Sequence, residues 1–196
     1  MKNEFKRMQF LAGIIKENTL YEEQEPDFSA LAQIYYIVGD ELEKAQKEEP
    51  INEILGLTAA AFLLALPGII NGVFRIIKAI KAKAPSRFNL SKPGDNQSHI
   101  DYIIAFTDKM DDILDTPFRI MLTPFIKDST KRDKVAKFIK AIALLIMALG
   151  TDISKSPTIM NVGEELIGDV FNQVSRSKTL EDLIKNAKTI IPKLLT

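Results

Sequence analysis

Five aspartates crowd one short stretch of the chain, and they are the residues best placed to do chemistry. They are Asp101, Asp108, Asp111, Asp112 and Asp115. On a helix, Asp108 and Asp112 lie one turn apart, as do Asp111 and Asp115. Carboxylates at that spacing can hold Mg²⁺ or Ca²⁺. Hydrolysis would also need carboxylates from a second helix and a base. We therefore interpret the stretch as a solvated acidic face that holds no metal.

The single histidine, His99, lies between Ser98 and Asp101, so the three residue types of a hydrolase triad occur together. Side chains this close along one helix point in different directions and cannot converge on one reacting atom. We therefore expect His99 to be an exposed histidine at the start of a helix.

Motifs that mark catalysis are missing from this chain. It contains no cysteine, which excludes disulfides, thiol catalysis and cysteine-ligated zinc. The phosphate-binding pattern G-x-x-x-x-G-K-[ST], the dinucleotide pattern G-x-G-x-x-G and the zinc pattern H-E-x-x-H do not occur. We expect a protein that is not an enzyme, with no cofactor and no small-molecule substrate.

Composition places the chain among ordinary globular proteins. Its 196 residues suit one domain, or one domain with a short appendage, and 46% of them are apolar. Lys and Arg number 26, as do Asp and Glu, so the net charge is zero. A neutral chain creates no overall field that attracts nucleic acid, which is therefore not an expected partner.

Apolar residues recur at intervals of three and four along most of the chain, which is typical of amphipathic helices. No segment shows sustained two-residue alternation, so the pattern predicts an all-α bundle of six to eight helices. Expected helices span residues 2–17, 28–47, 54–83, 98–115, 129–150, 160–175 and 179–190, with short helical turns at 116–118 and 123–125.

Several residues are expected to begin or end these helices. Ser98 is the expected N-cap of one helix, and Ser129 or Thr130 that of another. Gly150 is the expected C-cap. The uncharged run at 141–151 is too short to span a bilayer, so we expect it to lie in a buried core helix.

The most distinctive segment is residues 54–74, a run of 21 residues with no charge. This is about the length, roughly 20 residues, that a helix needs to cross a bilayer. Pro67 and Gly68 are expected to kink it near the middle, or to split it into two shorter helices. Gly68 and Gly72 form a G-x-x-x-G spacing, which lets a second helix approach closely.

Two interpretations of this segment remain open: a membrane span, or a helix buried at the centre of a bundle. Basic residues follow it, including Arg75, Lys78 and Lys81; residues 54–92 carry a net charge of +6, whereas residues 21–53 carry −8. In a membrane the basic side would face the cytoplasm. Leu64→Asp is expected to abolish membrane association under the first interpretation and to unfold the bundle under the second.

The chain opens with MKNEFKRMQFLAGIIKE, in which Phe5, Met8, Leu11 or Ala12, and Ile15 share one face of a helix. From residue 6 to residue 17 this segment resembles the N-terminal leader of virion proteins of large contractile-tailed phages, especially marine ones. The resemblance implies that the leader directs the protein into the prohead, where a protease removes it after a Leu/Ile-x-Glu sequence.

Here Ile15, Lys16 and Glu17 match the cleavage pattern, so Asn18 would be the new first residue. The same three-residue pattern recurs at residues 20–22 and 51–53. The alternative is that residues 2–17 form an ordinary first helix packed on the bundle.

We expect three parts: a leader or docking helix at 1–17, an acidic linker at 18–27 and a helical domain at 28–196. The leading hypothesis is a non-enzymatic phage virion protein with capsid proteins or its own copies as partners, in the virion or host cytoplasm, and with residues 54–83 available to a membrane. The alternatives are a membrane-anchored or membrane-perturbing protein unrelated to capsids, and a soluble helical scaffold or adaptor.

Overall fold

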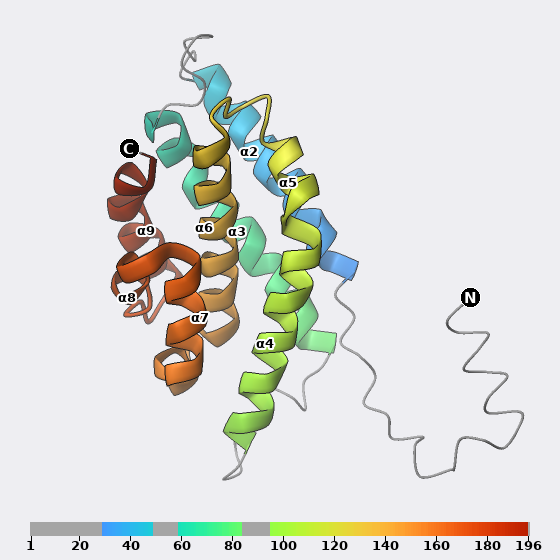
Figure 1. Cartoon of the computed structure of the whole chain (residues 1–196), viewed down its shortest axis with the longest axis vertical. Coiled ribbons are helices and arrows are strands. Elements are labelled where there is room, and N and C mark those ends of the chain that lie inside the picture. Colours follow the sequence, from blue (N-terminus) through green and yellow to red (C-terminus); the bar gives the residue numbers. More distant parts are fainter. Residues whose placement is uncertain (1–28, 49–58, 84–94, 196) are drawn as a thin grey trace, which may run out of the picture.

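A computed structural model describes residues 29–48, 59–83 and 95–195, and every regular element in these ranges is a helix (Figure 1). The predicted all-α bundle of six to eight helices is confirmed. The elements are η2 (Ser29–Ala32), α2 (Gln33–Glu48), α3 (Ala59–Lys83), α4 (Asp95–Leu114), α5 (Thr116–Met121), α6 (Ser129–Ala148), η4 (Asp152–Lys155), α7 (Pro157–Ile167), η5 (Gly168–Val170), α8 (Phe171–Val174) and α9 (Leu180–Leu195).

Helix α6 is the inner helix of the bundle. It contacts α3, α4, α5, α7 and α9, and in Figure 1 it lies between α7 and α9 on one side and α4 and α5 on the other. Every residue from Ala141 to Ala148 is buried. The short apolar run in the sequence is therefore part of a helix with partners all around its second half.

Helix α2 covers α3 with a conventional amphipathic face. Ile34, Val38, Leu42 and Ala45 are buried at intervals of three and four residues. Tyr35 is partly buried and meets the ring of Phe118 edge-on, with ring centroids 5.4 Å apart. The opposite face of α2 carries charged and polar residues together with the exposed Tyr36, so the helix lies at the surface.

Helix α3 holds the apolar run, of which the structure describes residues 59 onward. It packs against α2, α6 and α9 and buries a stripe of large side chains. Members of this stripe are Phe62, Leu66, Ile69, Ile70, Val73, Ile76, Ile77 and Ile80. The helix continues through Pro67, so the expected single apolar helix is observed from residue 59 to residue 83, and the alternative in which the Pro-Gly pair splits the run into two helices is wrong. The Asn71 side-chain amide donates to the Pro67 carbonyl at 2.8 Å, which satisfies a polar group inside this apolar segment.

The two glycines of the G-x-x-x-G spacing lie on the side of α3 that faces α2. A Cβ atom at Gly72 would overlap the side chain of Ile37, and one at Gly68 would overlap that of Glu41. The missing side chains thus let the two helices approach closely. This is the use expected of small residues four apart.

Alanine substitutions at two glycines should have opposite effects on stability. Gly72→Ala should lower the free energy of unfolding by about 1–2 kcal/mol, because the branched Ile37 cannot move away freely. Gly39→Ala on α2 should raise it by about 0.5–1 kcal/mol, because alanine favours the helix and the new Cβ would meet only the Met121 sulfur, at 3.8 Å. Urea denaturation measures both, and equal shifts would contradict the close α2–α3 contact.

Some helix boundaries differ from those expected. Helix α4 begins at Asp95, three residues before Ser98, so Ser98 lies inside the helix and is not its N-cap. An aspartate in the first turn of a helix is favoured by the helix dipole. Helix α6 is capped by Asp128, not by Ser129 or Thr130. The Asp128 carboxylate accepts from the Thr130 and Lys131 amides at 2.8 and 3.0 Å.

Two glycines and the two Thr-Pro-Phe sequences mark further differences. Gly168, at φ 65°, ends α7, so the single helix expected at 160–175 becomes α7, η5 and α8. Gly150, at φ 80°, follows the C-cap residue Leu149 of α6. The first Thr-Pro-Phe sequence starts α5, whereas the second forms only a hydrogen-bonded turn, in which the Ile126 amide donates to the Leu122 carbonyl at 2.8 Å.

Candidate functional site

The residues singled out on α3 divide between two faces of the helix. Gly68 and Gly72 face α2, whereas Arg75 and Lys78 are exposed to solvent. Leu64 is 48% exposed and is therefore not a core residue of the described bundle. The expectation that Leu64→Asp unfolds a bundle is corrected on this ground, because a carboxylate there stays in contact with water.

Lys81, near the end of α3, interacts with His99 on α4. Burial lowers the pKa of the Lys81 ammonium to about 8. Burial, and then the positive charge of Lys81, lower the pKa of His99 as well. His99 is only 1% exposed, so the expectation of an exposed histidine is wrong. The early start of α4 explains the difference, since it places His99 inside the helix, on the same buried side as Tyr102, Ile103 and Phe106.

The lowered pKa of Lys81 predicts a specific pH dependence of stability. Between about pH 8 and the ordinary pKa of 10.5, the unfolded chain binds more protons than the folded one. The free energy of unfolding therefore rises with pH across this window because of Lys81, and the full penalty of charging this lysine applies below pH 8.

In Lys81→Met this contribution is absent, so the stability of the variant relative to the natural chain should fall as pH rises from 8 to 10. Urea denaturation across this range tests it, with Lys78→Met as the matched loss of a lysine. Parallel profiles for Lys81→Met and the natural chain would contradict it.

The aspartates singled out between residues 101 and 115 are paired with bases or exposed. Asp111 forms an ion pair with Lys140, a lysine of α6 whose side chain is 7% exposed. Asp115 pairs with Arg119 at 2.8 Å, and the same guanidinium reaches Asp133 at 2.6 Å. Together with Asp112, the residues Asp111, Asp115 and Lys140 line a hollow of about 540 Å³. Within the described ranges, no three acidic or histidine side chains are arranged to hold a metal ion.

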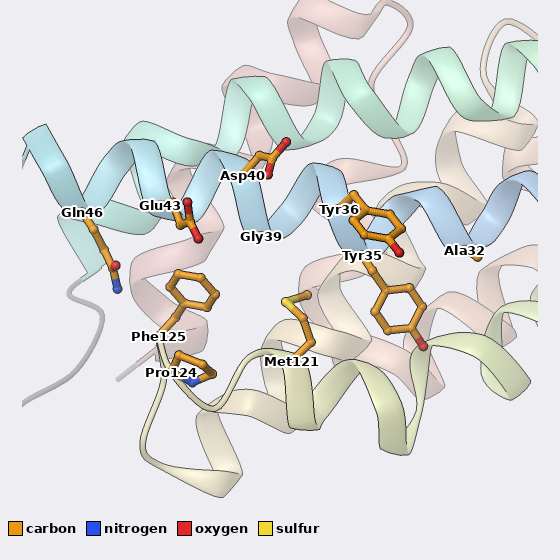
Figure 2. A pocket seen from close by; sticks show the side chains of 10 residues that line it. All are labelled: Ala32, Tyr35, Tyr36, Gly39, Asp40, Glu43, Gln46, Met121, Pro124 and Phe125. Carbon is orange, nitrogen blue, oxygen red and sulfur yellow. The ribbon is translucent and has the colours of Figure 1, made fainter.

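An open groove of about 620 Å³ separates α2 from the segment that joins α5 to α6 (Figure 2). Its walls are mainly aromatic and apolar, and acidic residues of α2 stand at its rim. The lining residues are Ala32, Tyr35, Tyr36, Gly39, Asp40, Glu43, Gln46, Met121, Pro124 and Phe125. We call this hollow the α2–α5 groove.

Three features distinguish the α2–α5 groove. Tyr36 is 75% exposed although it is a large aromatic residue. Gly39 leaves the floor open, and Figure 2 shows Met121 and Phe125 directed toward α2 from the opposite wall. Asp40 and Glu43 are both exposed and give this part of α2 a negative charge; Figure 2 shows Glu43 directed toward the groove and Asp40 directed away from its opposite wall. An apolar strip with an acidic rim can bind an apolar segment that carries basic residues.

The sequence did not reveal this groove. Tyr36, an aromatic residue on the polar side of the 28–47 helix, was a signal that could have been followed. The second wall comes from residues about 80 positions later, and only the fold brings them opposite α2.

The predicted leader and its cleavage site lie outside the described residues. This holds for Ile15, Glu17 and Asn18, for the expected helix at 2–17 and for the expected linker at 18–27. Comparison of the chain with protein-family models, with curated proteins and with solved structures finds no match.

Proposed function

We propose that this chain is a non-enzymatic phage virion protein that is packaged inside the capsid. The observation that carries the proposal is the N-terminal segment, which resembles a capsid-targeting leader from Lys6 to Glu17 and contains the cleavage pattern Ile15-Lys16-Glu17. Residues 1–17 act as the targeting segment, and the helical bundle is the body that remains in the particle.

The described bundle supports such a division. Its core extends from Leu31 on η2 to Leu195 on α9 and includes residues of every long helix. Side chains that are close-packed in this way hold the body together by burial of apolar surface. Removal of a segment that ends at Glu17 leaves all of these contacts in place, so the processed body is expected to stay folded.

Mass spectrometry of purified phage particles tests the proposal. Digestion with trypsin should yield peptides from the bundle, together with a peptide whose first residue is Asn18 and whose N-terminal end is not a tryptic site. In a phage that carries Glu17→Ala this peptide should disappear and the residues before Asn18 should persist. Glu22→Ala alters the neighbouring Leu20-Tyr21-Glu22 pattern and serves as the matched control, with processing at Asn18 unchanged. Particles that lack the protein would refute the proposal.

A second candidate function is membrane association through α3. Two observations favour it: the segment Ala60–Lys83 is long and apolar enough to cross a bilayer, with half of its most apolar window buried, and Leu64 is partly exposed on it. Length and composition alone are weak support, because the core helix of a soluble bundle has the same properties. Leu64→Asp separates the two, since it places a charge on the exposed side of α3 without entering the core.

A further inference from the structure

The α2–α5 groove has the dimensions of a site for a short helix. From Ala32 to Gln46 it follows 14 residues of α2, about 21 Å at 1.5 Å per residue. Its apolar contact area comes from Tyr35, Tyr36, Met121, Pro124 and Phe125. A row of apolar side chains at helical spacing fits such a strip in the helix-in-groove mode of recognition.

Residues 2–17 of this chain have the matching length and pattern. Sixteen residues in a helix extend about 24 Å, close to the length of the groove. Phe5, Met8, Leu11 and Ile15 would form one apolar stripe along that helix.

The charges of the two partners are complementary. Residues 2–17 contain four bases and two acids, so their net charge is +2, whereas Asp40 and Glu43 stand at the rim of the groove. Opposite charges around an apolar contact favour this pairing over others. A second copy of the groove would bring acids against acids, and the negative phosphates of nucleic acid would be repelled.

The connection between residues 2–17 and the bundle is long enough for the segment to reach the groove. The groove starts at Ala32, in the element that begins with Ser29, so the N-terminal segment is attached at one end of its proposed site. Eleven residues, 18–28, join Glu17 to Ser29 and can extend about 36–40 Å. That distance exceeds the length of the groove, so the segment can reach any part of it. Attachment also raises the effective concentration of the segment at the groove to the millimolar range.

We propose that the α2–α5 groove is the docking site of residues 2–17 of the same chain. The apolar stripe lies on Tyr36, Met121 and Phe125, and the bases of the segment lie along the rim that carries Asp40 and Glu43. The segment covers the groove while it is attached. The inference stands without the virion proposal; if that proposal holds as well, cleavage after Glu17 releases the segment and uncovers the groove.

Thiol labelling of the full-length protein tests this, because the natural chain has no cysteine to interfere. The variant Ala32→Cys places one reactive group in the groove, at an exposed position that is not one of the three side chains proposed to bind the stripe. Its rate of reaction with a maleimide dye is compared with that of the same chain carrying Met8→Asp and Leu11→Asp, which remove the apolar stripe. The second chain should react about tenfold faster or more, which corresponds to a docking preference of about 1.4 kcal/mol.

Two further cysteines serve as controls. Lys188→Cys, exposed on α9, should react at the same rate with and without the Met8 and Leu11 changes. Ala187→Cys, fully buried on α9, should remain unlabelled in both chains. Faster labelling at Ala187→Cys in the changed chain would mean that residues 2–17 support the core, and it would overturn the proposal.

The effects of rim charge and of protein concentration separate the proposal from its alternatives. In chains that also carry Asp40→Lys and Glu43→Lys, the rate ratio at Ala32→Cys should fall toward one, because the rim then repels the basic segment. A ratio of one in the chain with the natural rim would overturn the proposal. So would a ratio that grows with protein concentration, because the groove would then be covered by another copy of the chain.

Discussion

Ile70→Asp should unfold the bundle at room temperature. Ile70 lies near the middle of α3 and is fully buried, so an aspartate there would place a carboxylate in the core. Burial of such a group without a partner costs several kcal/mol, which is comparable to the whole stability of a typical domain, about 5–15 kcal/mol. Far-UV circular dichroism should show loss of most helical signal, or a melting temperature far below that of the natural chain.

Leu64→Asp on the same helix is the matched control. Leu64 is 48% exposed, so its aspartate remains hydrated and the melting temperature should stay close to that of the natural chain. Equal effects of the two substitutions would contradict the orientation of α3, because Leu64 and Ile70 would then lie in equivalent surroundings.

Phe138→Ala should produce the second large loss of stability. Phe138 on α6 is fully buried and meets the ring of Phe62 on α3 edge-on, with ring centroids 6.4 Å apart and an angle of 72° between the ring planes. Loss of a buried phenylalanine costs about 3–5 kcal/mol, because the cavity closes only in part. For a chain of this size, that corresponds to a fall of roughly 6–20 °C in melting temperature.

Ile120→Ala provides the comparison for Phe138→Ala. Ile120 is a large apolar residue of α5, but it is 65% exposed. Its replacement should change the free energy of unfolding by less than about 0.5 kcal/mol. A Phe138→Ala chain as stable as Ile120→Ala would show that α3 and α6 do not share a core at this contact.

Periodicity predicted the helices well because they are long and have a clear apolar face. The stripe from Ile69 to Ile80 on α3 is visible in the sequence at intervals of three and four, and the structure buries it. The seam with α2 follows from Gly68 and Gly72, because only small residues permit that approach.

Residues whose surroundings depend on distant parts of the chain were predicted less well. His99 was expected at the surface because its neighbours are polar, yet α4 begins early enough to carry it into the core. Leu64 lies in the same uncharged run as Ile70, and composition alone does not separate the two. Their exposure depends on where α2, α6 and α9 pack around α3.

The candidate sites show the same contrast between features that are local in the sequence and features that depend on distant residues. The five aspartates at 101–115 could be found in the sequence, but the ion pair of Asp111 with Lys140 could not, because Lys140 comes from another helix. The α2–α5 groove needs two segments about 80 residues apart, and no local pattern indicates that they meet. Asp128 as the cap of α6 was accessible in principle, since it directly precedes the expected Ser129.

The position of α3 in the bundle core is tested most directly by flotation of the full-length protein with liposomes, without detergent. With α3 packed against α2, α6 and α9, the protein should remain at the bottom of the gradient as a folded helical species. Leu64→Asp should behave in the same way. Flotation of the natural chain with the lipid, together with loss of flotation in Leu64→Asp, would contradict a core position for α3 and would favour the membrane-associated function.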